Sequence, residues 1–508
     1  MSQIFISGSN LTLESVVEVA RRGVAVALTE DAKAAIKESR AYVDKLVAEG
    51  RTVYGITTGF GEFAKVPIAP EQVELLQRNL IVSHACGIGQ FLSEEVARAI
   101  MLLRINALAI GHSGVRLEVV QTLIDMLNAG VVPVIPEKGS LGASGDLAPL
   151  AHMALPLIGL GEAFYKGEFL QGAEAMARAG IEPVKLAAKE GLALINGTQV
   201  MTAIGVLAVY DAKNLAKLAD IAAALTAEAL QGITDAYNPS LHALRPHPGQ
   251  VTVADNMLKL LNGSRRVSKQ GQIRVQDAYS LRCVPQIHGA SRDALNYVEE
   301  KLLVEINSVT DNPIILPHED AAISGGNFHG QPMALAFDFL AIAMAEIANV
   351  AERRIERLVN PALSGLPAFL TKEGGLNSGF MIAQYAAASL VSENKVLAHP
   401  ASVDSIPSSA GQEDHVSMGT IAARKAAEVL YNAKKVVGIE LLAAAQGVDL
   451  KPEGGKLGAG TQMAYDIIRK IVEKLEGDRE LYIDFEKMGI LVDANIIVDA
   501  VEQAVGRL

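Results

Sequence analysis

The sequence predicts a mainly α protein, in which a large bundle of long helices is joined to a smaller, mixed N-terminal domain. Four segments within residues 201–508 combine helical periodicity with few breakers, namely 204–231, 331–358, 379–398 and 415–445. Helices of this length are well above the average of about 11–12 residues and are typical of the rods of a bundle. Residues 1–200 mix shorter elements with loops that contain several glycines, so we place the domain boundary near residue 200.

The shorter elements of the first region follow from local signals. Residues 31–50 have the apolar spacing of an amphipathic helix, with Gly50 as its stop. Residues 93–110 predict a second helix, with Ser93 as the N-cap and two glutamates in the first turn. Residues 162–172 alternate aromatic and polar side chains, which predicts a small β-hairpin.

The composition indicates a soluble protein with a large buried interface. Half of the residues are hydrophobic, 5% are aromatic and none is Trp, while the mean hydropathy of +0.25 is high for a monomer. A membrane span is the alternative, but the longest uncharged run, residues 191–210, contains Asn196, Thr198 and Gln199 and makes a poor one. Because the N-terminus lacks the basic segment of a secretory signal, we expect a cytoplasmic protein with no membrane partner.

Charge and cysteine content exclude two further classes of protein. The net charge of -12 at pH 7 and a pI near 5.4 argue against a nucleic-acid partner. Cys86 and Cys283 are the only cysteines, which is too few for a disulfide framework or a structural zinc set. We therefore expect two buried free thiols and no metal site.

Residues 142–147, Gly-Ala-Ser-Gly-Asp-Leu, carry the most unusual chemistry in the sequence. Attack of the Gly145 nitrogen on the Ala143 carbonyl would close a five-membered ring. Loss of water, including the Ser144 hydroxyl, would leave an exocyclic methylene, an electrophile that no coded side chain provides. Gly145 suits this closure because it has no Cβ. The alternative is a tight turn with Asp146 as a helix N-cap, and the tripeptide taken alone favours that turn.

Two polar stretches interrupt apolar surroundings later in the chain. Residues 196–199, Asn-Gly-Thr-Gln, form either a helix-end cap or a site, and burial of their amides would require several hydrogen-bond partners. If residues 276–282 are helical, Gln276, Tyr279 and Arg282 share one broad face. A guanidinium there can grip a carboxylate with two hydrogen bonds, which leaves the phenol for proton transfer. The alternative is a surface salt-bridge helix.

Four loop residues have a structural and a functional interpretation each. Tyr54 begins a loop rich in Gly and Thr, and His84 ends a predicted helix; the simpler interpretation of both is a packed loop residue. Glu413 lies in the run Gln-Glu-Asp-His, which either caps the following helix or presents this carboxylate to a pocket. Phe328 belongs to a glycine-rich loop that is either an ordinary turn or a source of a ring contact.

Taken together, these stretches resemble the histidine ammonia-lyase family, within the wider group of aromatic amino acid ammonia-lyases and aminomutases. The resemblance extends from Tyr54 to beyond His415 and includes six motifs in the family's order: Tyr-Gly-x-x-Thr-Gly-Phe-Gly, Gly-Ala-Ser-Gly-Asp-Leu-Ala-Pro-Leu, Asn-Gly-Thr-Gln, Gln-Asp-x-Tyr-Ser-Leu-Arg-Cys, Gly-Gly-Asn-Phe-His-Gly and Gln-Glu-Asp-His-Val-Ser-Met-Gly. One match is a weak signal, but six motifs in order make a chance match implausible. They favour ring formation over a simple turn at the tripeptide.

The resemblance implies a fumarase/aspartase-like fold and a homotetramer with active sites shared between subunits. It also implies that Ala143, Ser144 and Gly145 cyclise without another enzyme into 4-methylideneimidazole-5-one (MIO), so that residues 1–200 carry the MIO-forming loop and no metal or diffusible cofactor is needed. The implied reaction is the non-oxidative deamination of L-histidine, a small amino-acid substrate, to trans-urocanate and ammonia in histidine degradation.

The resemblance further implies a role for each candidate residue. The catalytic candidates, any of which could move the β-proton, are Tyr54, Tyr279 and Glu413. The residues implied to bind substrate or line the pocket are His84, Asn196, Gln276, Arg282 and Phe328. Among them, Arg282 is implied to hold the carboxylate, and Asn196 to form a hydrogen bond with the ring or the substrate.

The residues around Glu413 favour histidine as the substrate. The run Gln412-Glu413-Asp414 matches histidine-specific members, whereas members acting on phenylalanine or tyrosine resemble Asn-Gln-Asp there. A carboxylate can accept the imidazole N–H, which a phenyl ring lacks. Thr57 and Gln331 depart from the common histidine-type pattern. A tyrosine or phenylalanine ammonia-lyase or 2,3-aminomutase therefore stays as the alternative, and a non-catalytic helical assembly protein is a third possibility.

Overall fold

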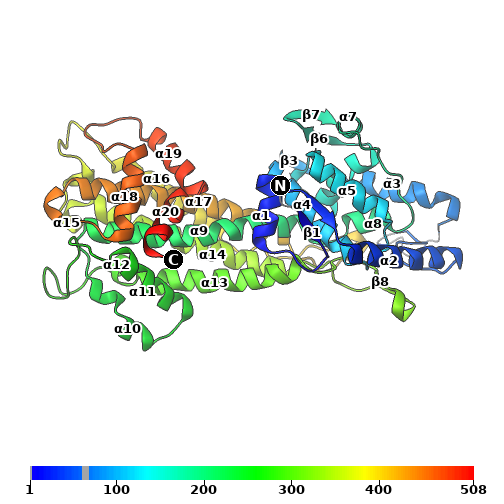
Figure 1. The fold of residues 1–508 in the computed structure, drawn as a ribbon, viewed down its shortest axis with the longest axis horizontal. Coiled ribbons are helices and arrows are strands. Elements are labelled where there is room, and N and C mark those ends of the chain that lie inside the picture. The colour runs from blue at the N-terminus through cyan, green and yellow to red at the C-terminus, as the bar shows by residue number, and fades with distance from the viewer. Residues whose placement is uncertain (1–2, 60–67) are drawn as a thin grey trace. The chain divides into compact units, whose positions relative to one another are not determined.

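The computed structural model describes residues 3–59 and 68–508, which contain the α-helices α1 to α20 (Figure 1). The chain forms two compact units, each built from separated segments. The first unit comprises residues 1–210, 299–338 and 400–424, and the second comprises 211–298, 339–399 and 425–508. The predicted mainly α fold is confirmed. The predicted boundary at residue 200 falls inside a helix and stays a prediction.

Four helices contain residues of both units, and they are the longest in the described chain: α9 (Gln199–Ala229), α13 (Val284–Glu305), α14 (Gln331–Val359) and α17 (Gly419–Asp449). The long helices predicted at 204–231, 331–358 and 379–398 are confirmed, the last as α16 (Met381–Leu397). The helix predicted from His415 begins later, at Gly419, because Met418 has a φ of 57°. Left-handed backbone of this kind interrupts a right-handed helix.

The remaining helices of the first unit are α1 (Leu13–Arg22), α2 (Glu30–Ala48), α3 (Val73–His84), α4 (Glu94–Ala109), α5 (Leu117–Ala129), α6 (Leu147–Ala154), α7 (Gly172–Arg178) and α8 (Glu190–Ile195). The predicted helices at 31–50 and 93–110 are confirmed as α2 and α4. The Ser93 side chain accepts a hydrogen bond from the Val96 N–H, as predicted for an N-cap. The helix α2 starts at the N-cap Thr29, whose side chain accepts from Ala32.

Short strands occur only in the first unit of the described chain. They form four small sheets, which pair β1 (Ile4–Ile6) with β2 (Val26–Leu28), β3 (Ile88–Phe91) with β5 (Pro136–Lys138), β4 (Val132–Pro133) with β6 (Glu162–Tyr165) and β7 (Glu168–Gln171), and β8 (Ile314–Leu316) with β9 (Ala321–Ile323). The predicted hairpin at 162–172 is confirmed, since β6 and β7 are antiparallel with Glu162 opposite Gln171.

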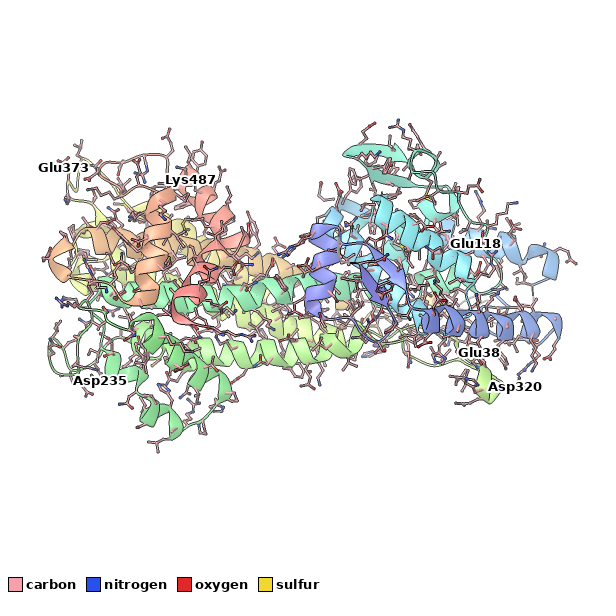
Figure 2. All side chains as sticks on the ribbon, in the orientation of Figure 1. Glu38, Glu118, Asp235, Asp320, Glu373 and Lys487 are labelled. Atoms are coloured by element: carbon pink, nitrogen blue, oxygen red, sulfur yellow. The ribbon has the colours of Figure 1, made fainter. Side chains whose placement is uncertain are left out.

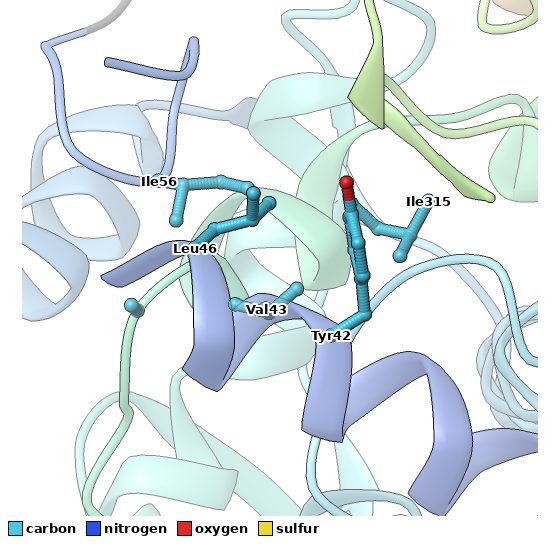
Figure 3. Close-up of a cluster of buried hydrophobic side chains, with 6 residues drawn as sticks. Tyr42, Val43, Leu46, Ile56 and Ile315 are labelled. Carbon is cyan, nitrogen blue, oxygen red and sulfur yellow. The ribbon is translucent and has the colours of Figure 1, made fainter. Parts of the chain in front are cut away.

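A buried apolar cluster anchors the loop that carries Tyr54. Tyr42, Val43 and Leu46 of α2 pack with Ile56 of that loop and with Ile315 of β8 (Figure 3). Near the same end of α2, Lys45 pairs at 2.8 Å with Asp320, which is labelled in Figure 2. The last two residues of the predicted Tyr-Gly-x-x-Thr-Gly-Phe-Gly motif, Phe60 and Gly61, lie outside the described residues.

The remaining helices of the second unit are α10 (Pro239–Ala243), α11 (Pro248–Leu260), α12 (Tyr279–Arg282), α15 (Pro361–Ser364), α16, α18 (Ala459–Ile471), α19 (Leu481–Asp493) and α20 (Ile496–Val505). Its interior contains fully buried ionisable side chains that pair with one another. Arg354 donates to both Glu440 oxygens, and Asp220 accepts from His288 at 2.7 Å. Such pairs fix the register of neighbouring helices because an unpaired charge there would be costly.

The composition predicts two buried thiols and no membrane span. Cys86 is exposed and Cys283 is half-buried, so the prediction of two buried thiols was wrong. The helix α14 is long and apolar enough to cross a membrane, but 67% of its apolar 18-residue stretch is buried inside the protein. A buried core helix of a soluble protein has these same properties.

Candidate active site

A cavity of about 1160 Å³ lies within the first unit. Six of the residues predicted for the site line it: Tyr54, His84, Ser144, Asn196, Phe328 and Glu413. They come from separate segments, including the end of α3, the turn before α6, the break between α8 and α9, and the loop before α17. The structure therefore brings together side chains that are up to 359 residues apart in sequence, Tyr54 and Glu413.

The Ser144 turn is held by hydrogen bonds at both of its ends. The Gly142 carbonyl accepts from the Ser417 N–H at 3.0 Å, and the Asp146 N–H donates to the Gly197 carbonyl at 2.7 Å. Gly142 and Gly145 have φ values of 72° and 73°, where residues with a Cβ are disfavoured. A Cβ on Gly145 would also lie 2.1 Å from the Gly197 oxygen. Only glycine fits this position.

Asp146 does not cap α6, although it directly precedes that helix. Its buried carboxylate accepts instead from the N–H groups of Val200 and Met201, at 3.0 and 2.9 Å, in the first turn of α9. Its other oxygen accepts from the hydroxyls of Ser140 and Thr420. The alternative interpretation, in which the Asp146 side chain caps this helix, is therefore wrong. Burial raises the pKa of Asp146, and these hydrogen bonds oppose that rise.

Residues 196–198 separate α8 from α9, and Asn196 lines the cavity. Asn196 follows the last residue of α8, and its main-chain carbonyl accepts from buried Arg104 at 3.0 Å. A second guanidinium nitrogen of Arg104 donates to the Ala193 carbonyl at 3.0 Å. Burial lowers the pKa of Arg104 to about 10, so it stays a cation at neutral pH. Asn196 therefore lies both at a helix end and at the cavity, and its role in a site stays a prediction.

Glu413 points into the cavity and does not cap a helix. Its carboxylate accepts from the Ser144 hydroxyl at 3.1 Å and from the Ser408 hydroxyl at 3.0 Å. Because α17 begins only at Gly419, the capping interpretation of this run was wrong. The direct contact with Ser144 links the tripeptide predicted to form the electrophile to the residue that the sequence associates with substrate choice.

His84 lies in the same cavity, where its ring is partly shielded from water. Burial lowers the pKa of His84, while a backbone hydrogen bond at Leu80 and the charge of Glu413 partly oppose that effect. The Ser83 hydroxyl lies 3.1 Å from His84 Nδ1. A neutral imidazole has one donor and one acceptor nitrogen, so this side chain can exchange hydrogen bonds with a polar ligand.

Gln276, Tyr279 and Arg282 line a different cavity, of about 430 Å³, within the second unit. The helix α12 begins only at Tyr279, so Gln276 precedes it and the predicted common helical face was wrong. The Arg282 guanidinium lies 4.6 Å from the centre of the Tyr279 ring and donates to the Asp277 carbonyl at 2.9 Å. Tyr279 is 69% exposed, so this guanidinium–phenol pair is open to a ligand or a partner.

Sequence reasoning missed several residues of the site. Ser408 holds Glu413, while Lys189 and Asp311 form a buried ion pair at 2.6 Å next to Asn196. Both residues are charged and lie in apolar stretches of the sequence, which could have drawn attention to them. The local sequence does not indicate that they pair with each other. Among residues 3–59 and 68–508, no cluster of three or more His, Cys, Asp or Glu side chains could hold a metal ion.

The chain is similar to known proteins along almost its whole length. The family model described as aromatic amino acid lyase matches residues 11–470. A histidine ammonia-lyase from Alkaliphilus oremlandii is 64% identical over 505 residues, which cover 99% of each chain. The crystal structure of histidine ammonia-lyase from Trypanosoma cruzi is 44% identical and has a TM-score of 0.93, covering 99% of this chain and 96% of that chain.

A tyrosine aminomutase from Streptomyces globisporus has a similar structure, with 39% identity, a TM-score of 0.96 and complete coverage of both chains. The fumarase/aspartase-like fold implied by the sequence is thereby confirmed. Because the family model and these relatives cover almost the whole length, the chain belongs to the aromatic amino acid lyase family.

Proposed function

We propose that this protein is a histidine ammonia-lyase, a carbon–nitrogen lyase that converts L-histidine to trans-urocanate and ammonia. The observation that carries the proposal is the 3.1 Å hydrogen bond from the Ser144 hydroxyl to Glu413, in a cavity that His84 also lines. This hydrogen bond places Ser144, part of the proposed electrophile, beside the Glu413 carboxylate, which can accept a hydrogen bond from imidazole. The identity of 64% to a histidine ammonia-lyase supports the same substrate.

The residues around the tripeptide fit the formation of MIO from Ala143, Ser144 and Gly145. Hydrogen bonds fix both ends of the turn. There is no space for a Cβ at Gly145, so this position must be glycine, which is also the residue that ring closure needs. Once formed, MIO supplies an electrophile that draws electrons from the amine or the imidazole of the substrate and so assists the departure of ammonia.

Glu413 and His84 are proposed to recognise the imidazole ring. The Glu413 carboxylate can accept the ring N–H, a hydrogen bond that a phenyl ring cannot form. His84 stays neutral at neutral pH because burial lowers its pKa, so it can contact the ring without repelling it. Phe328 provides an apolar wall of the same cavity.

The remaining steps need a carboxylate-binding group and a base. Arg282 is proposed to bind the substrate carboxylate through its guanidinium fork. Loss of ammonia breaks the α-carbon–nitrogen bond, and the β-proton passes to a base, for which Tyr279, Tyr54 and Glu413 are the candidates. Gln276 lines the cavity of Arg282 and is proposed to contact the same end of the substrate.

A homotetramer with shared active sites is proposed to bring these groups together. Arg282 and Tyr279 of a neighbouring subunit would complete the cavity that contains Ser144. The helix α14 supports such an assembly, because Leu335, Phe339 and Ile342 follow one helical face and are 39–47% exposed. An exposed apolar stripe of this kind marks an interface. We further propose a soluble, cytoplasmic enzyme without a nucleic-acid or membrane partner, in keeping with its net charge of -12.

A tyrosine- or phenylalanine-specific lyase, or an aminomutase, is the second candidate function. The similarity to the tyrosine aminomutase structure, with a TM-score of 0.96, favours keeping it in the test. An aminomutase would return ammonia to the β-carbon, so the product would be a β-amino acid and not free ammonia with urocanate.

A substrate panel of histidine, tyrosine and phenylalanine tests the proposal. We expect histidine to be turned over fastest, with rising urocanate absorbance and free ammonia. Ser144→Ala is the control: it should lower turnover by about a thousandfold or more, and its intact mass should lack the loss of two waters that ring formation causes. Faster turnover of tyrosine, or a β-amino acid product, would overturn the assignment.

A further inference from the structure

The side-chain amide of Asn196 can adopt only one orientation. Its Nδ2 lies 3.1 Å from the Asn312 main-chain carbonyl and 3.4 Å from Asp311 Oδ1. Both of these atoms are acceptors, so the amino group of the amide must face them. A flipped amide would place two oxygens against its own oxygen, and Oδ1 therefore has to point the other way.

Asp311 is itself fixed by a buried cation. The Lys189 ammonium donates to Asp311 Oδ2 at 2.6 Å, and the two side chains are 0% and 1% exposed. Lys189 precedes the first residue of α8 and Asn196 follows its last. Asp311 thus ties down both ends of this short helix, and its own Oδ1 also accepts from the Asn312 N–H at 2.7 Å.

The oxygen end of the amide is buried and has no hydrogen-bond donor among the described residues. Asn196 is 2% exposed, yet no donor among residues 3–59 and 68–508 reaches its Oδ1. The side chain lines the cavity that contains Ser144. Its neighbour Gly197 forms a backbone bridge with Gly145, so Asn196 lies beside the reactive turn. A buried acceptor without a donor is costly unless a ligand supplies one.

We propose that Asp311, held by Lys189, is a positioning residue that keeps Asn196 Oδ1 turned toward the cavity as an acceptor for the α-amino group of the substrate. An α-ammonium group carries three donors and no acceptor, which is the chemistry that an oxygen facing the cavity selects. The carboxylate and ring of the substrate have other partners. This inference rests on the proposed function, because it assigns the amino group of that same substrate.

Ligand binding to an unreactive enzyme tests this role. In a Ser144→Ala background, L-histidine and 3-(imidazol-4-yl)propionate are titrated by calorimetry; the second ligand has the same ring and carboxylate but no amine. The double substitution Asp311→Asn/Lys189→Met removes both charges together and lets the amide of Asn196 turn. We expect the Kd of L-histidine to rise about tenfold, as for loss of one hydrogen bond to a charged group, and the Kd of the propionate to change less than about twofold.

Each other outcome has a defined meaning. An equal rise in Kd for both ligands, or no rise for either, would overturn the inference. A residue that only supports the fold would not affect the binding of the amine-containing ligand more than that of the ligand without an amine. If circular dichroism shows that the double variant does not fold, Asn196→Ala carries the test with the same expected selectivity and the same contrary outcomes. If the Ser144→Ala parent itself fails to bind L-histidine, the proposed function is wrong and the inference falls with it.

A matched control removes a partly exposed ion pair elsewhere. Arg469 and Asp449 are paired at 2.6 Å, in α18 and α17, within the second unit. Asp449→Asn/Arg469→Met in the same background should bind both ligands as its parent does. A selective loss of L-histidine in this control as well would contradict a specific role for Asp311.

Discussion

Two atoms, Ser144 Oγ and a carboxylate oxygen of Glu413, meet at 3.1 Å. That contact makes Glu413 a neighbour of the proposed reacting centre and a candidate for substrate selection. Ser408 supports the second oxygen of the carboxylate at 3.0 Å, so the side chain is held from both sides. A carboxylate fixed in this way distinguishes an imidazole N–H from a ring carbon by hydrogen bonding and not by size.

Glu413→Gln should change substrate preference more than it changes the fold. The amide lacks the negative charge, so we expect kcat/KM for histidine to fall about 10- to 100-fold, with little loss for tyrosine or phenylalanine. Steady-state kinetics on the three substrates measures this. The intact mass should still show the loss of two waters, and equal losses for all three substrates would contradict the proposed selectivity.

The residues of the tripeptide could be predicted from the sequence, whereas their surroundings could not. Ser144 and Glu413 belong to recognisable motifs, but Lys189 and Asp311 do not, and their pairing spans 122 residues. The buried charges next to Asn196 therefore emerge only from the fold. The position of Gln276 could not be predicted from the sequence either. A helical pattern placed Gln276 on the same face as Tyr279, but α12 starts only at Tyr279, three residues later.

At the scale of single elements, α9 begins at a carboxylate from another part of the chain. Asp146 accepts from Val200 and Met201, in the first turn of this 31-residue helix, where unpaired N–H groups and the helix dipole favour a negative charge. The alternative interpretation of the sequence placed this cap on α6, because capping is usually local. Here the close approach of Gly145 to Gly197 allows a distant residue to take that place.

Asp146→Ala should destabilise the protein more than Asp146→Asn. Alanine leaves two buried N–H groups without an acceptor, a loss of about 2–4 kcal/mol, whereas the asparagine oxygen can still accept from one or both of them. Differential scanning calorimetry should therefore show a lower Tm for the alanine variant. Equal Tm values for the two variants would contradict a capping role for this carboxylate.

His152 of α6 should make stability depend on pH. Its Nε2 accepts from the Gly87 N–H at 3.0 Å, and burial lowers the pKa of His152. As pH falls through about 6.5, the usual pKa of histidine, the unfolded chain binds a proton that the folded protein resists, so stability falls with pH. His152→Gln should show a smaller decrease in Tm between about pH 7.5 and 5.5. His84 and His288 still titrate in this variant, so the decrease should be reduced and not abolished.

At the scale of the whole molecule, the described chain separates its candidate groups into two cavities. The cavity of about 1160 Å³ contains Ser144 and Glu413, and the cavity of about 430 Å³ contains Tyr279 and Arg282. Composition predicted a large subunit interface through the high mean hydropathy, and the exposed apolar face of α14 is a concrete candidate for it. The long helices were predictable from periodicity, whereas the two discontinuous units depend on contacts between distant segments.

Ile342→Glu should weaken assembly and, with it, activity. Ile342 is 47% exposed on α14, and a glutamate there would place a charge in the proposed subunit interface, where its desolvation is unfavourable. Analytical ultracentrifugation should show smaller species than in the parent, and turnover should fall because, in the proposed tetramer, Arg282 of a neighbour would no longer reach the site. Glu118→Gln, a change at an exposed residue (Figure 2), is the control and should assemble normally. An intact tetramer in the Ile342→Glu variant would place the interface elsewhere.

The hydrogen bonds at both ends of the Ser144 turn also set an order of events during synthesis. The Gly142 carbonyl needs the N–H of Ser417, and Asp146 needs the first turn of α9 and the hydroxyl of Thr420. A ribosome must therefore have added roughly 275 further residues after Gly142 before the turn can reach its final shape. If the tripeptide forms MIO as proposed, its maturation therefore indicates that most of the polypeptide has already been made and has folded. A nascent chain stopped before residue 417 should keep its serine unaltered.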